Sequence, residues 1–242
     1  MENNLKILFE NVDYLVIEKP AGITVNRSDT TSKEITLQDL IEKENKINPS
    51  DPDQEFLERS GIVHRLDKET SGAIIIAKNS KAFRELQRQF KERIVEKSYI
   101  ALAHGEIKPE KGEINVPVGR LPWNRKRFGV IAGGREALTY YEVEKYYQFE
   151  RETLTLVRLF PKTGRTHQIR VHLKHINHPI FSDPLYGGRK VSISDRKILH
   201  RVFLHAEQIS FLDPRTGDKV SYKSELSDDL VRFLKLISSS RN

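Results

Sequence analysis

The spacing of apolar residues along the chain follows two periods, and the shorter one predicts strands. Runs of β-branched and aromatic residues bounded by turn residues are typical of strands. Two further apolar segments, at residues 203–204 and 209–211, are too short for anything but brief strands. The longer runs that predict strands are residues 14–17, 72–78, 95–104, 112–118, 137–147 and 153–160.

The longer period, with apolar residues three and four positions apart, predicts helices. The clearest helix follows Asn79 as its N-cap, with one apolar face made of Ala82, Phe83, Leu86, Phe90 and Ile94. Thr36 is expected to cap a shorter helix, with Asp39 completing a capping box. Two more helices are expected, one after residue 164 and one over residues 228–237. Residues 48–53 are expected to form an exposed loop.

These elements indicate the fold class. Strands outnumber helices and do not alternate with them regularly, which favours an α+β fold with a mostly antiparallel, mixed sheet flanked by helices. No linker rich in Pro, Gly or Ser divides the chain. We therefore expect one domain over residues 6–237, with terminal tails at 1–5 and 238–242.

The composition of the chain limits where the protein is expected to act and which kinds of site it can hold. No apolar run approaches the ~18 residues that a membrane span needs, so no membrane partner is expected. The absence of cysteine excludes disulfides, thiolate metal sites and cysteine nucleophiles, and favours a cytoplasmic protein. No extended apolar stripe lacks a partner, so a monomer is expected.

The net charge of +7 is unevenly distributed. Two clusters of basic residues contain no acid. The first runs from residue 158 to 175 and the second from 120 to 127, around Trp123. This asymmetry favours a polyanionic partner, because lysine and arginine displace counterions from phosphates. The alternative is a set of solvated basic faces.

Residues 61–72 form the segment that is richest in side chains able to take part in chemistry. Polar side chains, among them Asp67, come directly before a predicted buried strand, and a loop on a rigid strand is a common place for a site. The alternative is an exposed turn in which Asp67 or Thr70 bonds only to the backbone.

Four blocks, in order along the chain, resemble the RluA/RluD-type pseudouridine synthase family. His64-Arg65-Leu66-Asp67, followed by Thr70-Ser71-Gly72, is similar to the signature loop of that family. The other blocks are Glu18-Lys19-Pro20-Ala21-Gly22, Lys97-Ser98-Tyr99-Ile100-Ala101, and residues 163–172 continuing to Asp183-Pro184-Leu185-Tyr186-Gly187. Together they extend from about residue 6 to 233.

The resemblance implies a pseudouridine-synthase-like domain that isomerises uridine in RNA, with Asp67 as the nucleophile. The base is detached, turned and rejoined through C5. Attack at ribose C1′, addition at C6 and a glycal route all remain open, and each needs an ionised carboxylate beside the nucleoside. The family requires no metal and no organic cofactor.

Further site residues follow from the same resemblance. Arg170 is expected to pair with Asp67 and keep it charged, and Tyr99 to stack on the displaced base and take part in removing the C5 proton. Arg165 is a rival on spacing, but one and a half helical turns would place it opposite Arg170, so we expect it to contact phosphate or serve the structure. Ile169 is expected to line the uracil pocket.

RNA binding requires more residues, because a buried uridine must be flipped out of its stack. Arg65 is expected to fill the vacated space or hold phosphate, with His64 as a weaker candidate and Thr70 in the same substrate-binding group. The basic side of the helix over residues 84–93 and the segment 120–127, with Trp123 as a stacking residue, would contact the RNA backbone.

The evenly spaced His172, His175 and His178 invite a metal interpretation. Pro179 ends the helix at His178 and no nearby acid completes a ligand set, so no metal site is expected. We expect His172 to pack or to bond to the backbone beneath its helix.

Only a dozen residues precede the first predicted strand, so the small N-terminal S4 domain of many family members is expected to be absent. Residues 164–170 and 186–189 look closer to those of the family's large-subunit rRNA enzymes, which favours large-subunit rRNA as substrate. The missing S4 domain favours the alternative of tRNA, or of both RNAs. Two other functions stay open: a non-catalytic RNA-binding factor of ribosome assembly, and a metal-dependent nuclease using Asp67 and Glu69.

Overall fold

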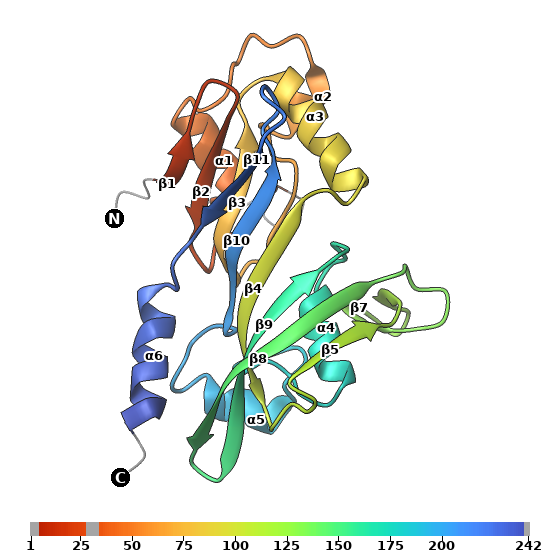
Figure 1. Ribbon diagram of the computed structural model, residues 1–242, viewed down its shortest axis with the longest axis vertical. Coiled ribbons are helices and arrows are strands. Elements are labelled where there is room, and N and C mark those ends of the chain that lie inside the picture. The colour runs from red at the N-terminus through yellow and green to blue at the C-terminus, as the bar shows by residue number, and fades with distance from the viewer. Residues whose placement is uncertain (1–4, 28–33, 240–242) are drawn as a thin grey trace. The chain divides into compact units, whose positions relative to one another are not determined.

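In the computed structural model, which describes residues 5–27 and 34–239, the chain divides into two units, each with strands, helices and an apolar core. Figure 1 shows the order of these elements along the chain. Residues 1–96 and 206–225 make the first unit, and residues 97–205 and 226–242 make the second. The expectation of one domain over residues 6–237 stays a prediction. Strand pairing within the units is antiparallel and helices accompany the strands of both units, so the expected α+β class is confirmed.

The strands of the first unit are arranged around one that is fully buried. Every residue of β3 (Ser71–Ala77) is buried, as its unbroken apolar run predicts. The strand order is β1-β2-β3-β10, and β11 pairs with β10. Its elements are β1 (Lys6–Glu10), β2 (Tyr14–Lys19), α1 (Leu37–Lys43), α2 (Gln54–Glu58), β3, α3 (Ser80–Lys91), β10 (Leu204–Leu212, in this unit from Ala206 onward) and β11 (Lys219–Lys223).

Both predicted helix caps of this unit are confirmed. The Asn79 side chain accepts a hydrogen bond from the Ala82 N–H at 2.9 Å and begins α3. Thr36 and Asp39 form the expected capping box at α1. The apolar face of α3 packs against β3 in the core of the unit. The helix is therefore held by burial as well as by its cap.

In the second unit the strands pair in the order β4-β9-β8-β5, and β6 and β7 form a separate two-stranded sheet. Apolar side chains of β4, β9 and α6 form its core. Its elements are β4 (Glu96–His104), β5 (Lys111–Asn115), β6 (Val118–Leu121), β7 (Asn124–Val130), β8 (Leu138–Phe149), β9 (Glu152–Pro161), α4 (Gln168–His175), α5 (Arg189–Asp195) and α6 (Asp228–Ser239).

Three local predictions were wrong. Leu204 and residues 209–211 belong to the single strand β10, because polar residues between them do not interrupt a strand buried on both faces. Residues 112–118 are divided between β5 and β6. The loop at residues 48–53 is not exposed throughout: Asp51 is buried and accepts hydrogen bonds from the backbone N–H groups of Asp53 and Ser80.

Candidate active site

The Asp67 loop is held by a buried lysine from another block. Lys19 is fully buried, and its Nζ donates to the carbonyl oxygens of Pro20, Ile23 and Lys68 at 2.8, 2.9 and 3.1 Å. The Gly22 N–H donates to the same Lys68 carbonyl at 2.8 Å. A buried ammonium needs such acceptors, so these bonds fix the backbone directly after Asp67. Sequence reasoning missed Lys19 as a site residue, although its block was noticed.

The far end of the loop requires a glycine. Gly72 has φ +118°, and a Cβ on it would stand 2.2 Å from the carbonyl oxygen of Ala206 in β10. Only glycine permits this approach of two strands. The Thr-Ser-Gly end of the signature loop thus has a packing cause, and it sets where β3 begins after Asp67.

The expected substrate-binding residues of this loop differ in their surroundings. Arg65 is exposed and Asp67 is half-buried. Thr70 is buried, and its N–H donates to the Asp67 carbonyl at 3.1 Å, which closes a turn. His64 accepts a hydrogen bond from the Ile75 N–H on Nε2 at 3.0 Å and stacks on Phe90 at 4.8 Å between ring centroids. These bonds give His64 and Thr70 structural roles in the loop.

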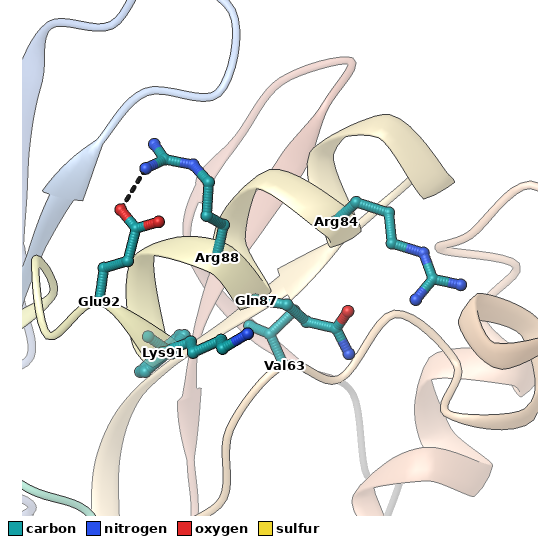
Figure 2. A pocket seen from close by; sticks show the side chains of 7 residues that line it. Val63, Arg84, Gln87, Arg88, Lys91 and Glu92 are labelled. Carbon is teal, nitrogen blue, oxygen red and sulfur yellow. Dashed lines mark hydrogen bonds and ion pairs between the residues drawn. The ribbon is translucent and has the colours of Figure 1, made fainter.

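A hollow of about 480 Å³ lies beside this loop, between Val63 and α3 (Figure 2). Its arginines are already neutralised. Arg84 forms ion pairs with Asp53 at 2.7 Å and Glu55 at 2.5 Å, and Arg88 with Glu85 at 2.7 Å and with Glu92. The basic side of α3 is therefore a weaker polyanion surface than its sequence indicated.

In the second unit, Tyr99 lies on β4 opposite Leu159 of β9, is half-buried and packs against the core. Two residues earlier on the strand, Lys97 has its Nζ near the 163–165 turn, 4.0 Å from where a Cβ on Gly164 would stand. Burial and then the like charge of Lys162 lower the pKa of Lys97 to about 8. Lys97 is a second candidate that sequence reasoning did not select.

A buried glutamine shapes the turn before α4. The Gln168 side chain accepts hydrogen bonds from the Thr163 hydroxyl at 2.7 Å and the Arg165 N–H at 3.0 Å, and donates to the Leu138 carbonyl at 3.1 Å. Because α4 begins only at Gln168, Arg165 lies in the turn, and the helical-turn argument for its position was wrong. Its Nε donates to the Glu136 carbonyl at 3.0 Å, which is a structural role.

Arg170 is buried on α4 and bound by Asp183. Its Nε and Nη2 donate to Asp183 Oδ2 and Oδ1 at 2.7 and 2.8 Å. The guanidinium carbon lies 5.1 Å from the centroid of the Tyr186 ring. The hydroxyl oxygen of Tyr186 is 2.9 Å from His167 Nδ1 and accepts a bond from the Phe128 N–H at 3.1 Å. Arg170 thus has a fixed orientation within its unit.

Asp183 and Tyr186 were recognised as part of a block but given no role. Asp183 is fully buried and also accepts bonds from the Leu185 and Tyr186 N–H groups at 2.9 and 3.1 Å. The signal available in the sequence was a lone acid within a basic region. Ile169, next to Arg170, is buried and belongs to the core.

The three spaced histidines do not converge. Buried His172 lies 3.0 Å from the Thr139 hydroxyl and 3.2 Å from the Val116 carbonyl, and His178 Nδ1 lies 2.8 Å from the His104 carbonyl. The expected backbone contact of His172 is confirmed. Among residues 5–27 and 34–239, no group of three potential ligand side chains could hold a metal ion. No helix in the same ranges is long and apolar enough to cross a bilayer.

The two units share the expected site residues between them. The first unit holds Asp67, His64, Arg65 and Thr70, and the second holds Tyr99, Arg165, Ile169 and Arg170. The loop of the first group is tied to its sheet by Lys19 and His64. In the second group, Gln168 and Asp183 hold the turn and Arg170. The pairing of Arg170 with Asp67 stays a prediction.

Known proteins resemble the chain over most of its length. A family profile described as RNA pseudouridylate synthase matches residues 13–175. Ribosomal large subunit pseudouridine synthase D of Nitrosomonas europaea is 38% identical over 237 residues, covering 96% of this chain and 65% of the relative. An uncharacterized RNA pseudouridine synthase of Aquifex aeolicus is 39% identical, covering 91% of this chain and 69% of its own length.

The chain thus spans about two thirds of these curated relatives. Among solved structures, human RNA pseudouridylate synthase domain containing 1 is similar with a TM-score of 0.69 and 25% identity, covering 98% of this chain and 96% of that one. The domain-containing 4 protein has a TM-score of 0.71 at 22% identity, covering 96% of this chain and 93% of its own, and so shares the fold. The expected pseudouridine-synthase-like fold is confirmed, and the chain belongs to the RNA pseudouridylate synthase family.

Proposed function

We propose that this protein isomerises uridine to pseudouridine in RNA, with Asp67 as the nucleophile. In this reaction the bond between ribose C1′ and N1 breaks, and C1′ bonds to C5 after the base turns. The hydrogen on C5 leaves and N1 takes up a proton. The main support is Asp67 itself, a half-buried carboxylate on a loop held by Lys19, within residues 13–175 that match the family.

Tyr99 and Arg170 are proposed to act with Asp67, Tyr99 against the base and Arg170 as the positive partner of the carboxylate. The positive charge would keep Asp67 ionised in a site that excludes water. Arg65, which is exposed beside Asp67, is proposed to occupy the space that the flipped uridine leaves. No described residue forms a hydrogen bond or ion pair with the Arg65 side chain, so RNA would not have to displace a protein partner.

Large-subunit rRNA is the proposed substrate, because the Nitrosomonas relative and one of Pseudomonas aeruginosa, 35% identical, are named large subunit pseudouridine synthases. A tRNA substrate is the alternative. A cytoplasmic monomer is also proposed: the absence of cysteine favours the cytoplasm, and light scattering would test the monomer.

The experiment is tritium release from RNA labelled at C5 of uridine, with large-subunit rRNA and bulk tRNA in separate reactions. Wild type is compared with Asp67→Asn and with Glu69→Gln, which removes a carboxylate from the same loop. We expect release by wild type and Glu69→Gln and none by Asp67→Asn. Bound RNA without release by wild type would favour the assembly factor, and magnesium-dependent RNA cleavage would favour the nuclease.

A further inference from the structure

The excess positive charge of the chain lies entirely in the second unit. That unit holds 23 lysine and arginine side chains against 12 aspartates and glutamates, a net charge of +11. The first unit holds 18 against 22, a net charge of −4. A surface that binds a polyanion is therefore to be sought on the second unit.

Within that unit, the most uniformly basic segment is the β6-β7 hairpin with the residues that follow it. Between Glu113 and Glu136 the sequence contains five basic residues and no acid. In the described part of the chain, no carboxylate forms an ion pair with any of its four arginines, which are Arg120, Arg125, Arg127 and Arg135. This contrasts with Arg84 and Arg88 on α3, each of which has acidic partners. Figure 2 shows the ion pair of Arg88 with Glu92.

The turn of the hairpin carries an aromatic side chain that the fold does not use. Trp123, the only tryptophan of the chain, is 77% exposed. Arg125 and Arg127 are exposed on the strand that follows. An indole next to cations is the combination that binds single-stranded nucleic acid, because bases stack on the ring while the cations contact phosphates.

The base of the hairpin is firmly anchored. Val118 and Phe128 pack with Val171 of α4 and with Tyr186 in a small apolar cluster. The Phe128 N–H donates to the Tyr186 hydroxyl, and the Arg170 guanidinium lies over the same tyrosine ring. The hairpin is thus a fixed element whose base adjoins the residue proposed to assist catalysis in this unit.

We infer that the β6-β7 hairpin binds an unpaired segment of the RNA substrate, with Trp123 stacked on a base and with Arg125 and Arg127 on phosphates. The inference rests on the proposed function for the kind of RNA that is presented. It commits to RNA with accessible bases, since a base inside a duplex offers no free face to an indole.

Because Trp123 is the only tryptophan, its fluorescence reports on the hairpin alone. Asp67→Asn protein, which would bind without turnover, is titrated with a single-stranded oligouridine and, separately, with a blunt RNA duplex. We expect the oligouridine to quench the emission and to protect Trp123 from acrylamide, and the duplex to do neither. Unchanged emission and unchanged acrylamide quenching, while anisotropy reports bound oligouridine, would overturn the inference.

Paired substitutions test the location of the phosphate contacts. Arg125→Ala with Arg127→Ala is compared with Arg232→Ala with Lys235→Ala, which removes the same charge from the exposed side of α6 in the same unit. The hairpin pair should reduce the slope of log affinity against log salt by about 1.4, at about 0.7 per phosphate contact on a single strand. The α6 pair should leave the slope unchanged. Equal effects of the two pairs would contradict a site on the hairpin.

Trp123→Phe and Trp123→Ala separate stacking from charge. Loss of the ring should weaken oligouridine binding about tenfold, and phenylalanine should restore most of it. Equal affinities of the two variants would count against stacking. Pseudouridine formation is measured on the same proteins with Asp67 intact. Failure of the proposed function would appear as no product from wild type, whereas failure of this inference would leave product formation and hairpin-independent binding.

Discussion

A buried arginine needs a counter-charge, and Asp183 supplies one to Arg170. Two parallel hydrogen bonds set the plane of the guanidinium, and Tyr186 covers one of its faces. Such bidentate geometry fixes orientation as well as charge. If Arg170 assists Asp67, as we propose, Asp183 is the residue that positions it.

We therefore expect Asp183→Asn to reduce the single-turnover rate of pseudouridine formation about 100-fold, the effect of a displaced group near the chemistry. It should also lower the free energy of unfolding by about 3 kcal/mol, because the buried Arg170 guanidinium loses the negative charge of Asp183. Rates are measured at a temperature at which circular dichroism shows the variant folded. RNA affinity should change little.

The matched control is Asp229→Asn, which removes an acidic partner of another arginine in the same unit, Arg201 at 2.6 Å. It should lower stability and leave the rate per folded molecule unchanged. A proportional rate loss in both variants would mean that Asp183 acts only through stability.

The buried His172 predicts how the stability of the protein depends on pH. Burial lowers the pKa of this imidazole to about 4, although the Val116 carbonyl acts in the opposite direction. The unfolded chain, with an ordinary histidine pKa near 6.5, then binds the proton more readily than the folded chain. The neutral, buried His172 therefore makes its full contribution to the stability of the folded chain above pH 6.5, and this contribution is lost as the pH falls towards 4.

In urea titrations from pH 8 to pH 4, wild type should lose on the order of 3 kcal/mol through this group. His172→Gln can keep a donor towards Val116 but does not titrate, so its stability should vary less over the same range. Subtracting the two curves cancels every other titrating group. A difference that does not change with pH would show that His172 is not the group responsible.

At the scale of elements, the glycine at the end of the signature loop is a packing requirement of two strands. A Cβ on Gly72 would meet the Ala206 oxygen at 2.2 Å, while one on Gly22, also at positive φ, would meet nothing within 4 Å. Replacing either glycine forces a side chain into an unfavourable backbone conformation, but only a replacement of Gly72 adds a clash with backbone atoms.

Gly72→Ala should therefore destabilise the protein by more than about 3 kcal/mol, and Gly22→Ala by only about 1 kcal/mol. Urea unfolding measures both, and soluble yield indicates whether Gly72→Ala folds at all. Similar values for the two variants would refute the close approach of β3 and β10 as the cause.

The elements that sequence predicted well are those with a long, consistent pattern. The apolar run of β3 and the capped, one-sided α3 are confirmed. The pattern was too weak for β1, β7, β11, α2 and α5, several of which carry polar residues at most positions. In strands of this kind, pairing with a neighbour decides the structure, and local sequence does not report pairing.

Site prediction had a similar limit. The blocks that resemble the family identified Asp67, Tyr99 and Arg170 as candidates. They did not indicate that Lys19 bonds to the Lys68 carbonyl or that Asp183 bonds to Arg170, because these contacts join residues 49 and 13 positions apart. Hydrogen bonds that satisfy buried polar groups depend on the tertiary fold.

At the scale of the whole molecule, the net charge of +7 conceals two opposite contributions, −4 and +11. A protein with this separation presents a basic surface to RNA from one unit only, and long-range attraction should make its RNA affinity strongly dependent on salt. Arg125 and Arg127 are the inferred phosphate contacts, and Arg120 and Arg135, which also have no acidic partner in the described part of the chain, would bring the number to four.

Four contacts on single-stranded RNA predict a slope of about −2.8 for log affinity against log salt, so affinity should fall roughly 50-fold between about 50 and 200 mM. Fluorescence anisotropy with a labelled oligouridine measures the slope, and thermal unfolding in the same salt series shows whether the fold is unchanged. A slope shallower than about −1 would mean that the charge of the second unit does not face phosphate, because each contact must release its share of counterions. A slope near −2.8 would mean that four contacts account for the binding of the oligouridine. The basic residues outside the hairpin, which make up most of the second unit's charge, would then be available to contact other parts of a larger folded RNA.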